Sequence, residues 1–392
     1  MITLVLGTRP EIIKLSPIIR ALVEEAVSLY IIHTGQHYNR NLDRIFFESL
    51  ELPEPKYHLS VGSGTHGEQT AKMIRGVERV LSADKPDVML VQGDTNSALA
   101  AAIVCAKLND VRLGHVEAGL RSYDRTMPEE VNRVLTDHIS DLLFAPTPNA
   151  KRILLGEGIA EEKIRVTGNT IVDAVQQNLS LARARSTIIS DLSLEPRSFI
   201  VLTLHRQENV VTEARLRGLV GAINVLAEEL GMPIVYPIHP RTRKALEQHG
   251  VAFTHRVAVI DPVGYFDFLV LEDEARLVLT DSGGVQEEAC ILGTPCVTLR
   301  ENTERPETID VGANYLGGIH YDSIRRSVDT MLARDERWPN PFGDGKAGER
   351  IARLVAATTD RGTKGAHDRS LSRSKFQTRR VSRRQLSVKN HP

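Results

Sequence analysis

Short apolar runs alternate with helical stretches along most of this chain, and that alternation limits the fold more than any other feature. Strands that alternate with helices predict a parallel sheet with helices on both faces. Two sets of apolar runs are present. The candidate strands of the first set are Ile2–Leu6, Ser28–His33, Asp87–Gln92, Val111–Glu117 and Leu142–Ala145, and those of the second are Phe199–Leu204, Ile234–Ile238, Ala258–Ile260, Leu277–Thr280 and Cys296–Leu299. We therefore predict an α/β protein in which two Rossmann-like domains face each other across a cleft.

Helical stretches fit between these strands and indicate where the domains divide. They lie around 17–25, 67–81, 97–108 and 128–139 in the first set, and around 213–230, 284–292 and 322–333 in the second. A poorly periodic stretch between Gly168 and Pro196 separates the two sets. We expect a first domain over 1–170, a second domain over 171–345, and a helix at about 346–357 that returns to the first domain.

Composition argues against several classes of function. The 392 residues carry a formal net charge of -1, which disfavours nucleic acid or an anionic membrane as the main partner. The longest apolar run, 98–106, is too short to span a bilayer, and the first residues lack the pattern of a signal peptide. Cys105, Cys290 and Cys296 lack the spacing of a disulfide framework or a zinc site, so we interpret them as core thiols. We expect a cytoplasmic protein.

The composition changes from about Asp360 onward, where basic and small polar residues replace apolar ones. Such a segment buries too little surface to offset the entropy lost on ordering. We therefore predict a basic, disordered tail over 360–392, with nucleic-acid or membrane contact as the weaker alternative.

The turn after the first strand predicts an anion site. It reads Gly7-Thr8-Arg9-Pro10-Glu11 and lacks the glycine spacing of a dinucleotide site or a P-loop. It would therefore bind an anion through Arg9 and Lys14. A better match to GxGxxG spans Gly62 to Gly67, but it follows the second strand rather than the first. We interpret that segment as a flexible loop that starts a helix, and we expect neither NAD nor a metal.

A second strand-to-helix turn lies in the other half of the chain. Ser282 can cap a helix that begins at Gly283, which leaves the amides of Gly283 and Gly284 free for a phosphate. Glu288 could accept hydrogen bonds from two ribose hydroxyls. Arg305, which we interpret as an exposed loop residue, could reach a diphosphate or a surface carboxylate.

Acidic residues follow the strands of the first set. Asp94 comes after one strand, Glu117 ends the next, and Glu129 opens a helix. Each has a structural alternative, because Asp94 could cap a helix, Glu117 could pair with Arg121, and first-turn acids are ordinary helix design. Together at one sheet edge, the three acids predict a cluster in which repulsion and burial raise one pKa for proton transfer. His205 would face them from the other domain, unless it only joins a hydrogen-bond network.

Eight runs, in order, resemble the non-hydrolysing UDP-N-acetylglucosamine 2-epimerases, and the resemblance extends from the first strand to about Tyr315. The runs are Gly7-Thr8-Arg9-Pro10-Glu11, His33-Thr34-Gly35-Gln36-His37, Gln92-Gly93-Asp94-Thr95, His115-Val116-Glu117-Ala118-Gly119-Leu120-Arg121, Pro128-Glu129-Glu130-Val131-Asn132-Arg133, Thr167-Gly168-Asn169-Thr170, Asp281-Ser282-Gly283-Gly284-Val285-Gln286-Glu287-Glu288 and Thr303-Glu304-Arg305-Pro306-Glu307. The resemblance implies the glycosyltransferase-B fold and conversion of UDP-GlcNAc to UDP-ManNAc. We also expect a homodimer.

The same resemblance implies roles for individual residues. Asp94, Glu117 and Glu129 fall on acid–base positions, and His205 falls near the departing phosphate. The residues that fall on UDP-contact positions are Arg9, Lys14, Ser282, Gly283, Gly284, Glu288 and Arg305, with Phe268 as a further contact near the uracil. The C2 hydrogen is not next to a carbonyl, so UDP must leave C1 to give a 2-acetamidoglucal, and re-addition inverts C2.

Two residues depart from the family pattern, and several other functions would fit the same motifs. Glu68 and Asn39 stand where bacterial members with a second UDP-GlcNAc pocket would carry Arg and Gln, so we expect no activation by substrate. The alternatives are a sibling epimerase acting on a UDP-diacetamido-uronic acid, a hydrolysing epimerase, a glycosyltransferase of the same fold, and a non-catalytic UDP-sugar sensor.

Overall fold

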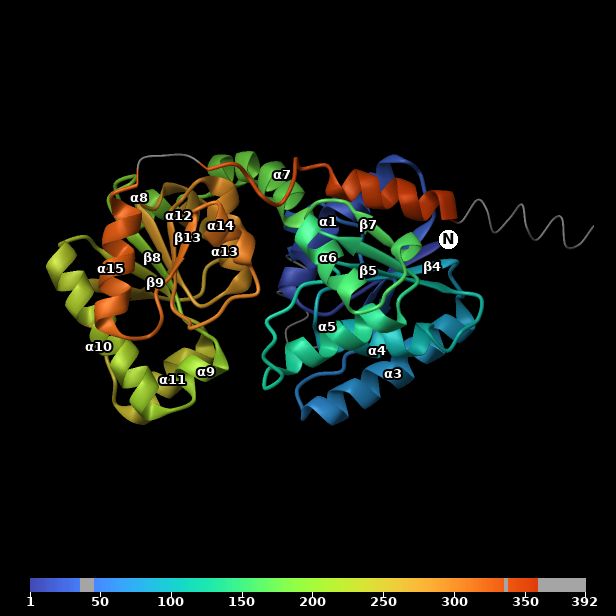
Figure 1. Ribbon diagram of the computed structural model, residues 1–392, viewed down its shortest axis with the longest axis horizontal. Helices are drawn as coiled ribbons and strands as arrows, with labels where there is room; N and C mark the ends of the chain where they lie inside the picture. The colour runs from blue at the N-terminus through green and yellow to red at the C-terminus, as the bar shows by residue number, and fades with distance from the viewer. Residues whose placement is uncertain (36–45, 335–337, 359–392) are drawn as a thin grey trace, which may run out of the picture.

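Two parallel β-sheets form two α/β domains in the computed structural model, which describes residues 1–35, 46–334 and 338–358 (Figure 1). The first sheet has the order β3-β2-β1-β4-β5-β6-β7, with β1 over Ile2–Leu6, β2 over Leu29–His33, β3 over Tyr57–His58, β4 over Val88–Gln92, β5 over Arg112–Val116, β6 over Leu142–Ala145 and β7 over Ile164–Val166. The second has the order β10-β9-β8-β11-β12-β13, with β8 over Ile200–Thr203, β9 over Ile234–Pro237, β10 over Val257–Ile260, β11 over Leu277–Thr280, β12 over Cys296–Thr298 and β13 over Asn314–Leu316. The predicted two-domain glycosyltransferase-B architecture is confirmed.

Helices cover both faces of each sheet because alternate strand residues point to opposite faces. In β1, Leu4 and Leu6 join one apolar cluster while Val5 joins another. The helices of the first domain are α1 over Arg9–Glu24, α3 over His66–Ala83, α4 over Asn96–Cys105, α5 over Pro128–Ile139 and α6 over Pro148–Gly156. Those that follow are α7 over Thr170–Arg185, α8 over Ile188–Asp191, α9 over Gln207–Val210, α10 over Glu213–Leu230, α11 over Pro240–His249, α12 over Tyr265–Glu274, α13 over Gly283–Leu292, α14 over Pro306–Asp310 and α15 over Tyr321–Leu332.

Helix α1 begins at Arg9, so the prediction that it starts near Pro17 was wrong. Pro10 occupies the first turn, where the missing N–H is tolerated, and Pro17 lies inside the helix. The Ser16 hydroxyl donates to the Ile13 carbonyl, the group that Pro17 has no N–H to reach. This start places both Arg9 and Lys14 on one helix.

The stretch predicted as a poorly periodic linker is mostly the helix α7. Its N-cap is Asn169, whose side-chain oxygen accepts from the Ile171 amide. Side chains of α7 share an apolar cluster with Ile12 of α1 and Leu269 of α12, so α7 packs against both domains (Figure 1). The helix over 347–358 adds Ile351 and Val355 to that cluster, beside the first domain.

The three cysteines are buried and unpaired, as predicted. Among the described residues, none of the helices combines the length and apolar character needed to cross a membrane. The predicted basic tail over 360–392 lies outside the described residues.

Candidate active site

The two sheets present the ends of their strands to a common site between the domains. In the first sheet, Gln92 pairs with Val116, so the segments that carry Asp94 and Glu117 leave neighbouring strands at the same level. In the second sheet, Thr203 pairs with Thr280, which places His205 beside the turn that starts α13. Parallel topology therefore brings these separate runs together, as expected for this fold.

Glu117 is buried and lies directly after β5 in the left-handed region, with φ 70°. A non-glycine residue in that conformation is strained, and such strain occurs at functional sites. Its Oε1 accepts from Lys14 Nζ at 2.5 Å and from Arg305 Nη2 at 3.0 Å, and its Oε2 accepts from Gln92 Nε2. Burial acts to raise the pKa of Glu117, but Lys14 and Arg305 outweigh burial and hold that pKa below its usual value. The prediction of a raised pKa does not hold at Glu117.

Lys14 and Arg305 also contact Glu287, a residue of α13 in the second domain. Lys14 Nζ donates to Glu287 Oε2 at 2.9 Å, and Arg305 Nε lies 2.6 Å from Glu287 Oε1. All four side chains are buried, so Arg305 is not the exposed loop residue that we predicted. We call Lys14, Glu117, Glu287 and Arg305 the interdomain charge cluster, because Lys14 and Glu117 belong to the first domain and the other two to the second.

Asp94 does not cap a helix. The cap of α4 is Thr95, whose hydroxyl accepts from the Ala98 amide. The Asp94 carboxylate instead accepts from Arg133 Nη2 at 2.5 Å, and its side chain remains 35% exposed. Asp94 is thus anchored through one oxygen while part of its side chain stays exposed.

The structural alternative proposed for Glu117 is also wrong. Arg121 pairs with Asp137 at 2.7 Å and with Glu157 at 2.6 Å rather than with Glu117. Arg121 is therefore a structural residue of the first domain, and Glu117 is left to the interdomain charge cluster.

The two acids that open α5 have different surroundings. The Glu130 carboxylate is buried and accepts from the amides of Ser122 and Tyr123, which fixes the loop after β5. Glu129 is partly exposed, and no hydrogen bond to its carboxylate is found within the described residues. Glu129 is therefore the acid of this pair with freedom to meet a ligand.

His205 is held by Asp281, which is fully buried at the end of β11. Nδ1 of His205 lies 3.2 Å from Asp281 Oδ1. Asp281 also accepts from the backbone amides of His205 and Arg206 and from the Asn209 side chain. Burial acts to raise the pKa of Asp281, but His205 and these donors lower it overall, so the carboxylate stays charged.

Ser282 precedes α13 as predicted, but its hydroxyl makes no capping hydrogen bond. A Cβ on Gly283 would lie 2.7 Å from Glu304 Oε1, so a side chain there would have to displace that carboxylate. A Cβ on Gly284 would meet only the Ser282 hydroxyl, at 3.9 Å. The close approach of Glu304 therefore gives a second possible reason for glycine at Gly283, besides phosphate binding. No such steric reason is found at Gly284.

Glu288 and Phe268 lie deeper in the second domain. Glu288 is buried, and burial raises its pKa to about 8, with Lys14 lowering it and Glu287 raising it. Phe268 on α12 is partly buried against an apolar cluster of that domain. Glu288 lies on α13, and Phe268 lies on α12, which packs beside α13.

Glu11 links the two turns of the first domain that carry Arg9 and Asp94. Its carboxylate accepts from the Gly7 amide at 2.9 Å, from Thr8 Oγ1 at 2.8 Å and from Thr95 Oγ1 at 2.6 Å. Burial raises its pKa to about 7, against these donors. Arg9 itself packs over the Phe46 ring, with its guanidinium carbon 5.8 Å from the ring centre.

The glycine-rich loop before α3 is a helix start, as we interpreted it. Thr65 caps α3, and Glu68 completes a capping box by accepting from the Thr65 amide. Glu68, which we named as a departure from the family pattern, is therefore occupied by helix capping. Gln36, His37 and Asn39 lie outside the described residues.

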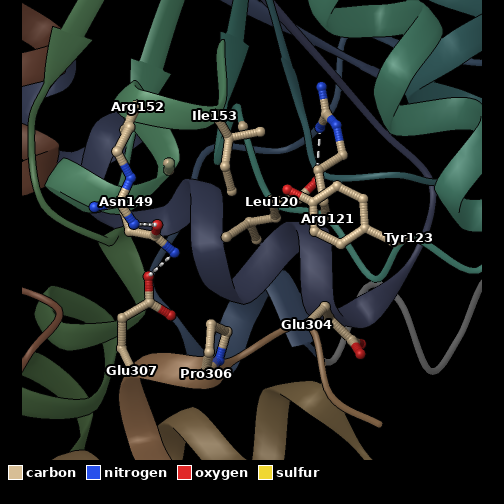
Figure 2. Close-up of a pocket in the computed structure, with 11 residues that line it drawn as sticks. Leu120, Arg121, Tyr123, Asn149, Arg152, Ile153, Glu304, Pro306 and Glu307 are labelled. Carbon is tan, nitrogen blue, oxygen red and sulfur yellow. Dashed lines mark hydrogen bonds between the residues drawn. The ribbon is translucent and has the colours of Figure 1, made fainter. Parts of the chain in front are cut away.

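A cavity of about 300 Å³ lies beside this site, between the loop after β5, helix α6 and the segment 304–307 (Figure 2). Figure 2 shows Glu307 of the second domain reaching Asn149 of the first. Glu307 Oε1 also accepts from Thr147 Oγ1 at 2.8 Å, which is a further contact between the domains. None of the residues predicted for catalysis or UDP binding lines this cavity.

Several residues that build the site were not predicted from the sequence. They are Glu11, Gln92, Asn169, Asp281 and Glu287. All five lie within the runs that carry the family resemblance, and all but Asn169 lie within a few residues of a predicted one. Their position within those runs was the signal that could have identified them. The sequence does not show which distant residue each of these side chains contacts.

A family model described as UDP-N-acetylglucosamine 2-epimerase matches residues 20–356. This chain belongs to that family. It is 54% identical over 366 residues to the UDP-N-acetylglucosamine 2-epimerase of Methanocaldococcus jannaschii, covering 90% of this chain and 98% of that protein. A crystal structure of the same M. jannaschii enzyme, in complex with UDP-GlcNAc and UDP, matches with a TM-score of 0.87 over 91% of this chain and 99% of that one.

A family member whose name gives a different substrate is less similar. The UDP-2,3-diacetamido-2,3-dideoxy-D-glucuronate 2-epimerase of Pseudomonas aeruginosa is 42% identical over 354 residues, covering 90% of this chain and 98% of that protein. The identity to the M. jannaschii UDP-GlcNAc epimerase is thus clearly higher than the identity to the diacetamido-uronic sibling.

Proposed function

We propose that this chain catalyses the reversible epimerisation of UDP-GlcNAc to UDP-ManNAc at C2 of the sugar. The observation that carries the proposal is the interdomain charge cluster, in which Lys14 and Arg305 meet Glu117 where the strand ends of both sheets face each other. Two buried cations at this place suit a diphosphate that departs and returns. Membership of the epimerase family supports the same activity.

We assign the chemistry to residues as follows. Asp94, Glu117 and Glu129 form the acid–base group, and His205, oriented by Asp281, lies near the departing phosphate. The proposed UDP contacts are Arg9, Lys14, Ser282, Gly283, Gly284, Glu288 and Arg305, with Phe268 near the uracil. Departure of UDP with loss of the C2 proton gives the 2-acetamidoglucal, and re-addition with protonation from the opposite face gives the epimer.

Elimination and re-addition involve no hydride transfer, so the reaction needs no added NAD. We also expect no requirement for a metal. We expect deuterium at C2 of both UDP-sugars when the enzyme turns over UDP-GlcNAc in heavy water, because a base that takes the proton exchanges it with solvent. NMR of the products tests this with UDP-GlcNAc as the sole substrate. Epimerised product that keeps its C2 hydrogen would overturn the mechanism.

The same experiment separates the rival functions. A glycosyltransferase or a UDP-sugar sensor has no step that breaks the C2–H bond, so neither would incorporate deuterium. A hydrolysing epimerase would release free ManNAc. Absence of any product from UDP-GlcNAc, with turnover of a UDP-diacetamido-uronic acid, would assign the chain to the sibling activity.

We further propose a cytoplasmic homodimer. Val131 and Leu135 on α5 are 36% and 47% exposed, beside an apolar groove between α3 and α5 that Ile74 also lines. Exposed apolar side chains next to such a groove support an interface with a second copy. Buried free cysteines fit a reducing compartment. Light scattering on the purified chain tests the dimer, and a monomeric mass would contradict it.

A further inference from the structure

Glu287 has no role in the assignment above, yet it contacts both cations of the interdomain charge cluster, as Glu117 does. We propose that Glu287 is a positioning residue that fixes Lys14 and Arg305. Glu287 and Glu117 share the positive charge of these two residues. Protonation of Glu117 is therefore coupled to the charge on the departing diphosphate. This inference rests on the proposed function and adds a regulator of the acid–base step.

The geometry of Glu287 supports such a role. Its two oxygens point to different cations, with Oε2 2.9 Å from Lys14 Nζ and Oε1 2.6 Å from Arg305 Nε. Asn169 Nδ2 donates to Oε1 at 2.8 Å from the first domain. The Glu287 side chain is fully buried, so water does not screen these contacts. Glu287 is therefore held by three groups from two domains.

The same two cations also bind Glu117, and this creates a balance of charge. Lys14 and Arg305 carry two positive charges, while Glu117 and Glu287 carry two negative charges, so the cluster is neutral with both acids ionised. Burial raises the pKa of Glu287, although Arg305 and Lys14 lower it, whereas the pKa of Glu117 is lowered overall. The two acids thus differ although they share the same cations.

This balance changes during the reaction. When the C2–H bond breaks, the proton goes to Glu117 and the electron pair forms the C1–C2 double bond, while the C1–O pair leaves with the β-phosphate of UDP. Neutral Glu117 no longer compensates Lys14 and Arg305, and the cluster gains one positive charge. The departing diphosphate gains one negative charge at the same time. Lys14 and Arg305 by themselves oppose protonation of Glu117, and the negative charge that develops on the diphosphate offsets their charge, so the two changes are coupled.

Glu287→Gln tests the proposal because it keeps the shape and removes one negative charge. The cluster of the variant carries a net positive charge, which holds Glu117 in its ionised form more firmly. Glu117 is then a weaker base. Its protonated form, which would donate the proton in the reverse step, is also less populated. We expect kcat to fall by about three- to tenfold with the acid limb of its pH profile moved to lower pH, following Brønsted behaviour. UDP affinity by calorimetry should be unchanged or tighter, because the diphosphate meets more positive charge.

A second variant tests the proposal independently in case Glu287→Gln does not fold. Asn169→Ser removes the donor to Glu287 Oε1, while serine remains a good N-cap for α7. Without that donor Glu287 takes up a proton more readily, so we expect the loss of kcat to appear only at the acidic end of the profile. Unchanged kcat in both variants across the profile would overturn the proposal.

Glu307→Gln is the matched control. Glu307 is another buried carboxylate that joins the domains, through Thr147, but it does not contact Lys14 or Arg305. We expect its pH profile and UDP affinity to stay as in the wild type. If Glu287→Gln instead weakens UDP binding in proportion to its loss of kcat/KM, Glu287 is only a structural link between the domains.

The failure of this inference is distinguishable from failure of the proposed function. Wild-type protein that binds UDP but makes no UDP-ManNAc contradicts the function. In that case the calorimetric comparison alone decides the inference, and weaker UDP binding by Glu287→Gln overturns it. Wild-type turnover with a variant that behaves like the Glu307→Gln control contradicts the inference alone.

Discussion

Nδ1 of His205 lies 3.2 Å from Oδ1 of Asp281, and the two residues follow neighbouring strands of the second sheet. Asp281 is fully buried, while the His205 side chain is 38% exposed. With Nδ1 held by Asp281, the other ring nitrogen is the one left for a ligand. If His205 acts near the departing phosphate as proposed, Asp281 would contribute by orienting that histidine.

Asp281→Asn should lower kcat by about ten- to a hundredfold, as is typical when a supporting partner of a functional side chain is lost. The asparagine cannot accept from His205 and from the amides at once, so we also expect a lower melting temperature. A double-mutant cycle with His205→Ala measures the coupling. Additive losses of activity would show that Asp281 acts through the fold and not through His205.

Arg305→Ala should weaken UDP binding by at least about tenfold, because charge-assisted contacts contribute roughly 1.5–3 kcal/mol. Since Arg305 is buried against Glu117 and Glu287, its loss also leaves two carboxylates short of a partner, which destabilises by about 3–5 kcal/mol in comparable cases. Calorimetry with UDP and thermal melting measure the two effects. A lower melting temperature with normal UDP affinity would limit Arg305 to a structural role.

Asp94→Asn and Glu117→Gln should both bind UDP and lose most epimerisation, because each change keeps the shape and removes a proton acceptor. Deuterium incorporation at C2 of UDP-GlcNAc provides the measurement. Glu130→Gln is a useful comparison, since Glu130 is an acid of α5 whose carboxylate fixes the loop at Ser122 and Tyr123. If the Asp94 and Glu117 variants keep full activity per folded molecule, the acids are structural.

Stability should fall with rising pH because of Glu272, a fully buried residue of α12 whose two carboxylate oxygens have no hydrogen-bond partner among the described residues. Burial raises its pKa well above the usual value, with Glu288 and Asp273 adding to the effect. Between the unfolded and folded pKa values, the folded state keeps a proton that the unfolded state has lost. The free energy of unfolding therefore decreases as pH rises through that window.

Glu272→Met removes this titration, and replacing a buried unpaired acid by an apolar side chain is favourable. We expect the variant to be more stable than the wild type by roughly 1–3 kcal/mol at about pH 8, with a smaller difference at about pH 5.5. Chemical denaturation at both pH values measures it. Glu274→Met, a partly exposed acid on the same helix, is the control and should show no such pH dependence. Equal differences at the two pH values would contradict the assignment to Glu272.

Sequence periodicity located the strands of both sheets because apolar runs in buried parallel strands are nearly continuous. It missed β3, β7 and β13, each of which has only two or three residues. It also missed α7, because that helix is covered on several sides and shows no single apolar stripe. The positions after strand ends, such as Asp94 and Glu117, followed from the general rule that parallel sheets place functional residues at their carboxyl edge.

The sequence by itself determined the two-domain α/β architecture, the family, and the segments that meet at the site. These follow from local periodicity and from runs of neighbouring residues, which need no knowledge of distant contacts. Only the tertiary structure decided the partners of the charged side chains. Lys14 and Glu287 are separated by 273 positions, and their contact depends on how two domains meet. Because the energy of a buried charge depends on the charges within a few ångströms, the states of Glu117, Glu287 and Arg305 were fixed by packing between domains.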